Sequence, residues 1–286
     1  MDTEFERYLE SILSKAGGEG CPPKLAAAMR YSVFPGGARI RPKICLGVFK
    51  AVGGTRNKLA FGAAAAVELL HCASLVHDDL PCFDDATERR GKPSVHCAYG
   101  ERIAVLVGDA MIVLAFETLV RAGVSEQNLP DLVAILSAGV GAPSGICAGQ
   151  AWECESEIDL SRYHQSKTGA LFIASAKAGA AAGDADPAQW IRLGSAIGEA
   201  YQVADDIHDV ITESQVAGKP NGQDALHGRP NAVEALGLEG AVRRVKSLLT
   251  EGVDSIPPCP GREQLIELML EHSKNFLPSA LGQQAA

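Results

Sequence analysis

Residues 58–79 read KLAFGAAAAVELLHCASLVHDD, a long apolar run that ends in an acidic pair. Its length and spacing predict one long helix rather than a strand. The four alanines at 63–66 would let the backbone of a neighbouring helix approach closely. This stretch therefore predicts a core helix that carries its only two aspartates at its exit.

Similar helical patterns occur before and after this stretch. The spacing of apolar residues, together with Pro and Gly at the breaks, predicts further helices over 5–13, 24–34, 42–51, 101–121, 128–152, 163–182, 187–212, 231–253 and 260–278. Segments 81–100 and 214–231 are polar and rich in turn formers, so we expect loops there. No segment alternates apolar and polar residues, no internal repeat is evident, and no linker divides the chain. We therefore expect one all-α domain over residues 1–286.

The composition supports this class and excludes another. Hydrophobic residues make up 47% of the chain and aromatic residues only 5%, so the core must consist mainly of small aliphatic side chains. Such a core suits closely packed helices. The balance of 26 Lys+Arg against 35 Asp+Glu gives a net charge of -9. A nucleic-acid binder is usually basic, so we expect no nucleic-acid partner.

The cysteines and the N-terminal residues bear on the compartment. The eight cysteines contain no C-x-x-C pair and lie scattered through the chain, which is typical of free, buried thiols in a reducing environment. The N-terminus lacks the pattern of a signal peptide. The uncharged stretch 132–152 is long enough to span a membrane, but glycines and Pro143 interrupt it. We expect a buried, kinked helix there, no transmembrane segment, and a cytoplasmic protein.

The first aspartate cluster, HDDLPCFDD over residues 77–85, lies where the long helix ends. Pro81 interrupts helical hydrogen bonding, so the chain must bulge before Asp84. This bulge would bring Asp84 back toward Asp78.

The second cluster, DDIHD over residues 205–209, is predicted to lie within a helix. Asp205 and Asp209 are four residues apart and share one helix face, where their charges repel. Each cluster follows a strongly apolar stretch, which favours the edge of a core over an open surface. A pair of solvated acidic patches that flank helices is the alternative interpretation.

Basic residues follow each cluster, Arg89 and Arg90 after the first and Lys219 after the second, and Lys167 adds a further cation. Carboxylates are hard oxygen ligands that select Mg²⁺, which is commonly shared with phosphates. Arg and Lys can hold the outer phosphate oxygens. The sequence therefore predicts a site for magnesium and a diphosphate.

These motifs resemble those of the trans-isoprenyl diphosphate synthases. Residues 70–91 look like the first aspartate-rich motif of that family, and 198–209 look like the second. Gly36-Gly37 with Arg39 and Arg41-Pro42 resembles its early basic motif. Lys167-Thr168-Gly169 and Gly218-Lys219-Pro220 resemble two more, and all five occur in the family's order.

The resemblance implies ten or more helices around a deep central cavity, usually in a homodimer. It implies condensation of isopentenyl diphosphate with an allylic diphosphate, with three Mg²⁺ per active site. The implied metal ligands are Asp78, Asp84 and Asp205, with Asp79 and Asp209 as ligands or neighbours of ligands. The implied diphosphate grips are Arg89, Lys167 and Lys219, and the implied contacts of isopentenyl diphosphate are Arg41, His71 and Arg90. Gln202 and Thr168 would line the reaction centre.

Two positions depart from the family pattern. Ala38 stands where the family usually has Lys, so one diphosphate contact is either missing or taken over by Arg39. The loop near Arg229 lacks a Lys that the family often has there.

Product length depends on the wall beneath the first cluster. Ala73 and Ser74 lie one helical turn deeper than Asp78, and both are small. Farnesyl-making relatives tend to have an aromatic residue at the Ala73 position, so we expect a geranylgeranyl product. Residues 70–90 also resemble the geranylgeranyl diphosphate synthases of bacterial carotenoid pathways. Farnesyl diphosphate is the second expectation.

Three other classes remain as alternatives. A phosphohydrolase with a His77-Asp78 metal dyad would need several converging histidines and would leave Asp205 and Asp209 without a role. An inactive partner subunit would be expected to have lost one cluster. A terpene cyclase would replace the second cluster with an Asn/Ser/Glu motif.

Overall fold

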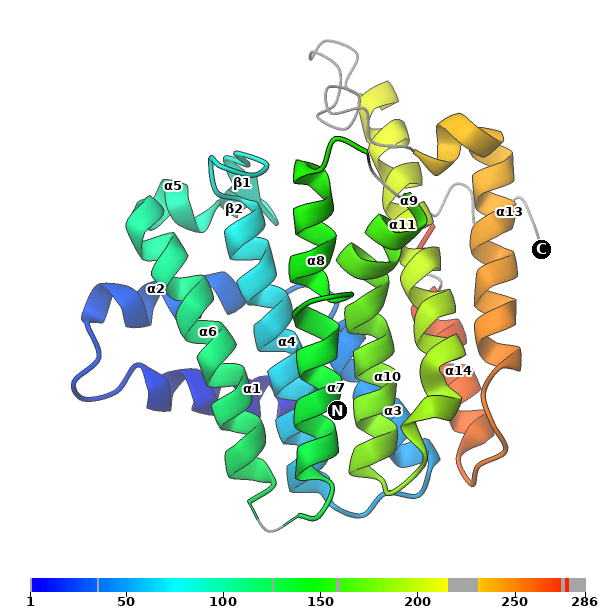
Figure 1. Ribbon diagram of the computed structural model, residues 1–286, viewed down its shortest axis with the longest axis horizontal. Coiled ribbons are helices and arrows are strands. Elements are labelled where there is room, and N and C mark those ends of the chain that lie inside the picture. Colours follow the sequence, from blue (N-terminus) through cyan, green and yellow to red (C-terminus); the bar gives the residue numbers. More distant parts are fainter. Residues whose placement is uncertain are drawn as a thin grey trace.

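The computed structural model describes residues 2–34, 36–124, 126–157, 160–215, 231–273 and 276–277. Within these residues the protein is helical, and its only strands are the two-residue β1 (Glu88–Arg89) and β2 (Lys92–Pro93). Most long helices run roughly side by side, whereas α1 and α2 lie across one side of the bundle (Figure 1). The all-α prediction is confirmed.

The central helix is α4 (Asn57–Asp78), the stretch whose length and composition predicted it. It packs against α6 (Glu101–Ala122), α3 (Ile40–Ala51), α10 (Ala170–Ala182) and α7 (Leu129–Val140). The alanines at 63–66 are fully buried. At Gly62 an added Cβ would lie 2.3 Å from the Cβ of Ala122, so the closest approach of α4 and α6 requires a glycine there.

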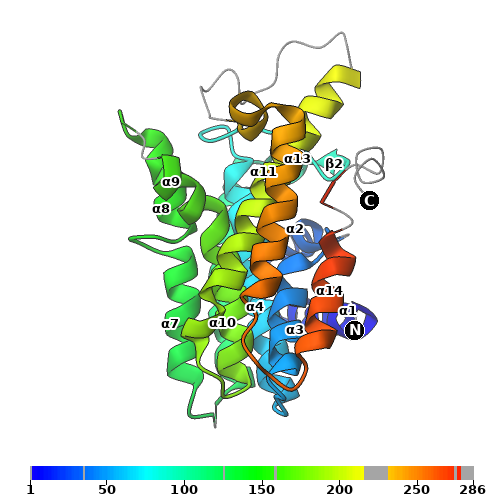
Figure 2. The same cartoon turned by 90° about the vertical axis from the view of Figure 1, so that its right-hand side faces the viewer.

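Two apolar clusters hold the bundle together. The first joins α4, α6, α7 and α10 to α1 (Asp2–Ala16) and α2 (Pro23–Val33). The second joins α3 and α10 to α11 (Ile191–Gln215), α13 (Ala232–Asp254) and α14 (Arg262–Ser273). Figure 2, which faces the right-hand side of Figure 1, shows α13, α14 and α3. Burying one leucine of such a core contributes about 2 kcal/mol, so these clusters supply most of the driving force.

The segment 128–152 is not the single kinked helix that we expected. It forms α7, a turn and the short α8 (Ile146–Ala151), followed by the 3-10 turn η1 (Trp152–Cys154). The turn contains a cis peptide bond between Ala142 and Pro143. At Gly145 an added Cβ would lie 2.4 Å from the backbone of Val140, which shows how tightly the chain folds back.

Other boundaries also differ from the prediction. The segment 81–100, expected to be irregular, contains the β1–β2 hairpin and the short α5 (Val95–Tyr99). The helix expected over 163–182 comprises α9 (Leu160–His164), a π turn η2 (Gln165–Gly169) and α10. A 3-10 turn, η3 (Pro187–Trp190), precedes α11. The loop expected over 214–231 falls almost wholly outside the described residues.

Among the residues that the structure describes, two helices, α4 and α6, are long and apolar enough to cross a membrane by length and composition alone. Of the most apolar window of α4, 78% is buried inside the protein, against 44% for α6. The helix α4 is therefore the core of the bundle, and α6 presents part of an apolar face outward.

Candidate active site

The first aspartate cluster forms where α4 ends. Asp78 is the last residue of α4, and the amide of Asp84 donates a hydrogen bond to the carbonyl oxygen of Asp78 at 3.0 Å. The chain thus bulges after α4 and returns, as Pro81 predicted. The amide of Leu80 closes the same turn on the carbonyl of His77 at 3.1 Å.

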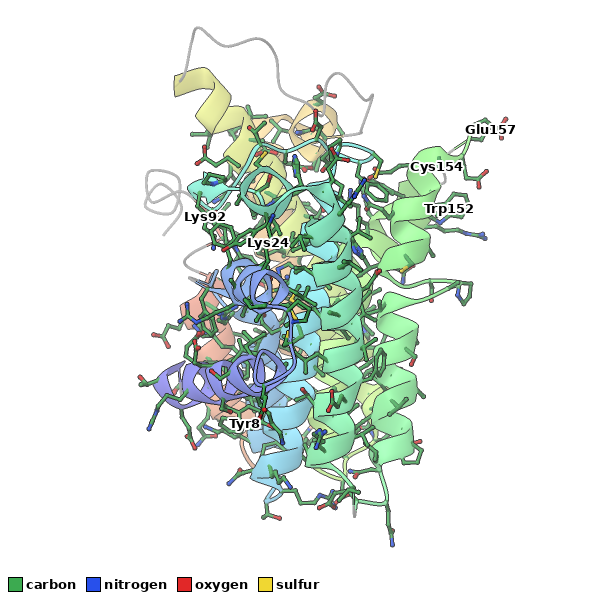
Figure 3. All side chains as sticks on the ribbon, turned by 90° about the vertical axis from the view of Figure 1, so that its left-hand side faces the viewer. Tyr8, Lys24, Lys92, Trp152, Cys154 and Glu157 are labelled. Carbon is green, nitrogen blue, oxygen red and sulfur yellow. The ribbon has the colours of Figure 1, made fainter. Side chains whose placement is uncertain are left out.

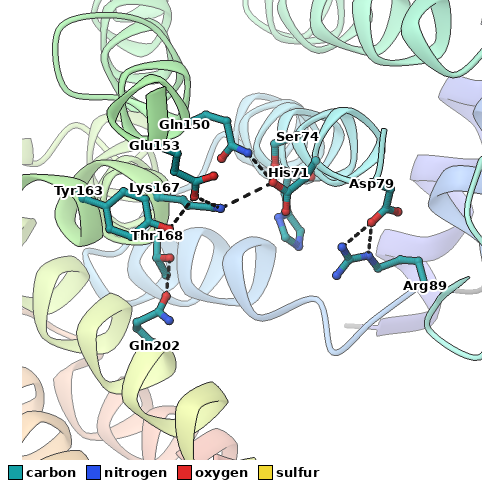
Figure 4. Close-up of polar contacts among 11 residues, drawn as sticks. His71, Ser74, Asp79, Arg89, Gln150, Glu153, Tyr163, Lys167, Thr168 and Gln202 are labelled. Carbon is teal, nitrogen blue, oxygen red and sulfur yellow. Dashed lines mark hydrogen bonds and ion pairs between the residues drawn. The ribbon is translucent and has the colours of Figure 1, made fainter. Parts of the chain in front are cut away.

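Asp78 is held from the opposite wall by two side chains (Figure 4). The Nε2 of Gln150 donates to Oδ1 of Asp78 at 2.6 Å, and the Nζ of Lys167 lies 3.6 Å from the same oxygen. Burial raises the pKa of Asp78, while the positive charge of Lys167 opposes that increase and the charge of Asp84 adds to it. The carboxylate therefore lies in a partly dry site where a cation is favourable.

Asp79 has a different environment from Asp78. Its side chain is almost fully buried and accepts a hydrogen bond from the Nε of Arg89 at 2.9 Å. Burial raises the pKa of Asp79, and the guanidinium of Arg89 opposes this. The pairing means that Asp79 orients Arg89, which itself faces the cavity described below.

The second cluster lies on α11. Burial and then the charge of Asp209 raise the pKa of Asp205 from 3.8 to about 7, although Arg41 opposes the increase. Asp206 points the other way, because its Oδ1 accepts from Gln202 at 3.2 Å and its Oδ2 accepts from the amide of Ala232 at 2.8 Å. Asp205 and Asp209 thus repel each other on one face of α11.

Both clusters border one cavity of about 880 Å³. Its polar end contains three of the predicted metal ligands, Asp78, Asp205 and Asp209, and its cations are Arg41, Arg89, Arg90 and Lys167. Its lining also includes Ala73, Ser74, Thr168, Gln202 and His71, as expected. Asp84 and Asp79 are not part of the lining. The apolar lining comes from four helices, through Leu70, Ile112, Val140 and Ile146.

The wall opposite α4 is built on the π turn. Lys167 donates from Nζ to Oε1 of Glu153 at 2.6 Å, and the hydroxyl of Tyr163 donates to the same oxygen at 2.6 Å. Thr168 donates from Oγ1 to Oε1 of Gln202 at 2.8 Å. Single π turns inside helices are frequent at functional sites, and this one places Lys167 and Thr168 on adjacent parts of the cavity wall (Figure 4).

Arg41 and His71 form a buried basic pair in the cavity. Their Nη1 and Nε2 atoms lie 3.4 Å apart, and the guanidinium of Arg41 stacks 4.2 Å from the ring centroid of Phe172. Within the described structure the buried Nε of Arg41 has no hydrogen-bond partner. Burial, together with the charges of Arg41 and Arg90, holds the pKa of His71 well below its ordinary value of 6.5. These features fit an anion that would satisfy Arg41.

Arg39 has a structural role that corrects our expectation of a substrate contact. Its Nη1 donates to Glu68 at 2.6 Å and its Nε to Glu6 at 2.8 Å, and the residue is only 6% exposed. It is not part of the cavity lining, so the described structure gives no support to Arg39 as a replacement for a Lys at position 38. Ala38 itself is exposed.

Several cavity residues escaped the sequence prediction, namely Phe83, Cys147, Gln150, Cys154, Tyr201 and His208, together with Glu153 beside them. One signal was available. Glu153 is the first charged residue after a long uncharged stretch, and Gln150 lies three residues before it, on the same helical side. Lys219, predicted as a diphosphate grip, lies outside the described residues, as does Arg229.

No group of three or more His, Cys, Asp or Glu side chains within the described ranges is arranged to hold a metal ion by itself. The available donors on the cavity lining are carboxylate oxygens, the ligands that Mg²⁺ prefers. Burial and the charge of Asp209 raise the pKa of Asp205, so a bound cation would stabilise its charged form. The residues present therefore fit magnesium whose remaining ligands come from water or a phosphate.

The comparisons with known proteins agree with this geometry. The family model described as polyprenyl synthetase matches residues 22–256. A geranylgeranyl diphosphate synthase from Cereibacter sphaeroides is 50% identical over 99% of this chain and 98% of its own, and one from Rhodobacter capsulatus is 48% identical over 94% and 93%. The crystal structure of a geranyltransferase from Helicobacter pylori complexed with magnesium and isoprenyl diphosphate superimposes with a TM-score of 0.76. It is 32% identical, over 94% of this chain and 96% of that one.

Proposed function

This chain belongs to the polyprenyl synthetase family, and from that premise we propose that it is a geranylgeranyl diphosphate synthase. It would condense isopentenyl diphosphate with allylic diphosphates up to the twenty-carbon product. The observation that supports this most directly is the placement of Asp78 and Asp205 on the lining of one cavity that four cationic side chains also line. Two solvated acidic patches would not share a cavity of about 880 Å³.

Magnesium is the proposed cofactor, with three ions per active site. Asp78 would contribute ligands from α4, with Asp84 close behind, and Asp205 and Asp209 would contribute them from α11. When bound, the ions would offset the charge of the diphosphate and of the carboxylates that now repel one another. The relative crystallised with magnesium and isoprenyl diphosphate supports this assignment.

The allylic diphosphate would lie between the clusters, gripped by Arg89 and Lys167. Arg89 is oriented by Asp79, and Lys167 by Glu153, so both cations are held in place before substrate arrives. We propose that Lys219 completes this grip. Preorganised cations stabilise the charge that develops on the leaving diphosphate as the carbon–oxygen bond breaks.

The alkene of isopentenyl diphosphate would then attack the allylic cation to form the new carbon–carbon bond. The diphosphate group of isopentenyl diphosphate would be held by Arg41, His71 and Arg90. It would supply the hydrogen-bond acceptor that the Nε of Arg41 lacks in the described structure. The proton released from the adduct would go to the departing diphosphate, so no protein base is required. The hydrogen-bonded pair Thr168–Gln202 lines the wall at this centre.

Product length would be set by the apolar end of the cavity. Ala73 and Ser74 form its α4 wall without filling it, and Leu70 lies about one turn deeper. Ile112, Val140 and Ile146 close it from α6, α7 and α8. A cavity near the upper end of the usual range of about 300–1,000 Å³ supports a twenty-carbon product over a fifteen-carbon one.

We also propose a cytoplasmic homodimer. The outward face of α6 carries four large exposed aliphatic residues, Val105, Leu106, Val113 and Val120, and a groove of about 560 Å³ lies along it. Exposed apolar surface of this kind marks an interaction site. The eight cysteines form no disulfide, which supports a reducing compartment. We place the product upstream of carotenoid synthesis.

The activity is tested by incubating purified protein with Mg²⁺, labelled isopentenyl diphosphate and dimethylallyl, geranyl or farnesyl diphosphate. Label should pass into extractable lipid, and chelator should abolish the transfer. Asp78→Ala and Asp205→Ala should each abolish it, whereas Asp186→Ala, at an exposed aspartate that precedes η3, should not. A protein that elongates none of the three primers would remove the enzyme proposal and favour an inactive partner subunit.

A further inference from the structure

The ammonium group of Lys92 anchors the hairpin that carries Arg89 and Arg90 to the end of α2. Lys92 lies on β2, directly across the ladder from Arg89. Its Nζ donates to the carbonyl oxygens of Tyr31 and of Phe34, the latter at 2.7 Å, and lies 3.8 Å from the ring centroid of Tyr31. Figure 3, which faces the left-hand side of Figure 1, labels Lys92.

These carbonyls belong to the C-terminal end of α2. The last four carbonyls of a helix have no acceptor role within it, and a cation is favourable there because of the helix dipole. Both hydrogen bonds from Lys92 go to such oxygens, and no carboxylate of the described residues forms an ion pair with it. The ammonium therefore caps α2 instead of serving as a surface charge.

Tyr31 completes the connection in the opposite direction. Its hydroxyl donates to the carbonyl oxygen of Pro93 at 2.7 Å, while its own carbonyl accepts from Lys92. The aromatic ring also makes an edge contact with Tyr99 at 5.2 Å between centroids. The two residues of β2 and the end of α2 are thus joined by reciprocal bonds, which we call the Lys92–Tyr31 clasp.

The clasp lies close to the cations that face the cavity. The hairpin turns through Arg90 and Gly91, whose φ angles are 55° and 75°, as a two-residue hairpin of this twist requires. On the other side, the chain runs from Phe34 through Gly37 to Arg41. An added Cβ at Gly37 would lie 2.8 Å from Nη2 of Arg90, so the guanidinium rests against the backbone of Gly37.

From these contacts we propose that Lys92 is a positioning residue that sets the distance between Arg90 on the hairpin and the Arg41–His71 pair. The inference rests on the proposed function, because these three residues form the proposed site of isopentenyl diphosphate. Without the clasp, the hairpin would keep its turn but lose its fixed place relative to α2 and α3. A shift of about 1 Å in such a group can cost up to a hundredfold.

The experiment compares Lys92→Met, Tyr31→Phe and the double variant with wild type, in the full-length protein. Lys92→Met should raise the KM for isopentenyl diphosphate about tenfold, with a much smaller change in the KM for the allylic substrate. Lys92→Arg should restore most of the loss, because it keeps the positive charge. The effects of Lys92→Met and Tyr31→Phe should be less than additive, because both break one clasp. Lys58→Met, an exposed lysine at the far end of α4, is the matched control.

A second readout separates this inference from the proposed function. The affinity of each variant for inorganic diphosphate is measured by calorimetry, and thermal unfolding shows that each variant is folded. Weaker diphosphate binding by folded Lys92→Met supports the clasp even if wild type elongates no primer. Wild-type affinity and an unchanged KM in Lys92→Met would overturn it while leaving the enzyme proposal intact. An equal rise of both KM values would also overturn it, since the clasp would then act on the whole site.

Discussion

Gln150 on α8 donates a hydrogen bond from Nε2 to Oδ1 of Asp78, at 2.6 Å, across the cavity from the end of α4. The same oxygen faces Lys167 at 3.6 Å. One carboxylate oxygen of the first cluster is therefore positioned by two elements far along the chain.

Replacing Gln150 with Leu should lower kcat/KM about tenfold to a hundredfold. A hydrogen bond to a charged group is worth about 1.5–3 kcal/mol, and its loss would free Asp78 to rotate. The matched control is Gln189→Leu, which removes a weaker glutamine–aspartate bond on the surface. Steady-state kinetics of both variants would show the contrast, and an unaltered Gln150→Leu enzyme would mean that Asp78 needs no such support.

The sequence predicted the helices best where apolar residues run without breaks. The helix α4 appears within one residue of its expected bounds, because nothing in 58–78 competes with helical packing. The return of Asp84 toward Asp78 was predictable because Pro81 interrupts helical hydrogen bonding and makes the chain bulge there. By contrast, the break in 128–152 depends on how Gly145 packs against Val140, which is a tertiary contact.

The residues of the candidate site also fall into two groups, those that local sequence motifs predict and those that depend on tertiary contacts. Charged residues in spaced motifs, such as Asp205 and Lys167, could be predicted because their residue types and spacing indicate metal and phosphate binding. The role of Tyr201 could not be predicted, because it depends on which helix lies opposite, and the position of Gln150 before Glu153 gave only an indirect signal. Arg39 was misassigned for the same reason, since the buried Glu68 that binds it is distant in sequence.

Arg39 and Arg41 should therefore respond differently to the same substitution. Arg39→Met would leave the carboxylate of Glu68 buried and unpaired, which should destabilise the fold by about 3–5 kcal/mol. Arg41→Met should keep the stability and raise the KM for isopentenyl diphosphate. Urea unfolding and kinetics measure the two effects, and Glu68→Gln should recover part of the stability lost in Arg39→Met. If Arg39→Met remained stable but bound substrate poorly, Arg39 would be a substrate contact after all.

His71 should make the free protein less stable in mild acid. Burial holds the pKa of His71 well below 6.5 in the folded state, so below that pH the unfolded chain binds a proton that the folded chain does not. Stability then falls as pH decreases, by up to about 1.4 kcal/mol per pH unit. The loss between pH 7 and pH 5.5 should be smaller in His71→Gln than in wild type. Equal losses in denaturant titrations would show that His71 titrates normally.

The exposed face of α6 should join two copies of the chain. Val113→Asp places a charge in the middle of this face, where Val113 is 67% exposed, and should weaken self-association at least about tenfold. Val124→Asp is the control, because Val124 is 76% exposed but follows the end of α6. Sedimentation at several protein concentrations gives the result. A wild-type protein of 30.0 kDa at all concentrations would contradict the homodimer.

The most direct measurement is the length of the product made by wild type and by Ala73→Phe. Both proteins are incubated with Mg²⁺, labelled isopentenyl diphosphate and dimethylallyl diphosphate, and the dephosphorylated alcohols are separated by length. Wild type should give the twenty-carbon alcohol, and Ala73→Phe should stop at fifteen carbons or fewer, because the ring would fill the cavity one turn below Asp78. A fifteen-carbon product from wild type, or an unchanged twenty-carbon product from Ala73→Phe, would contradict the assignment of this wall.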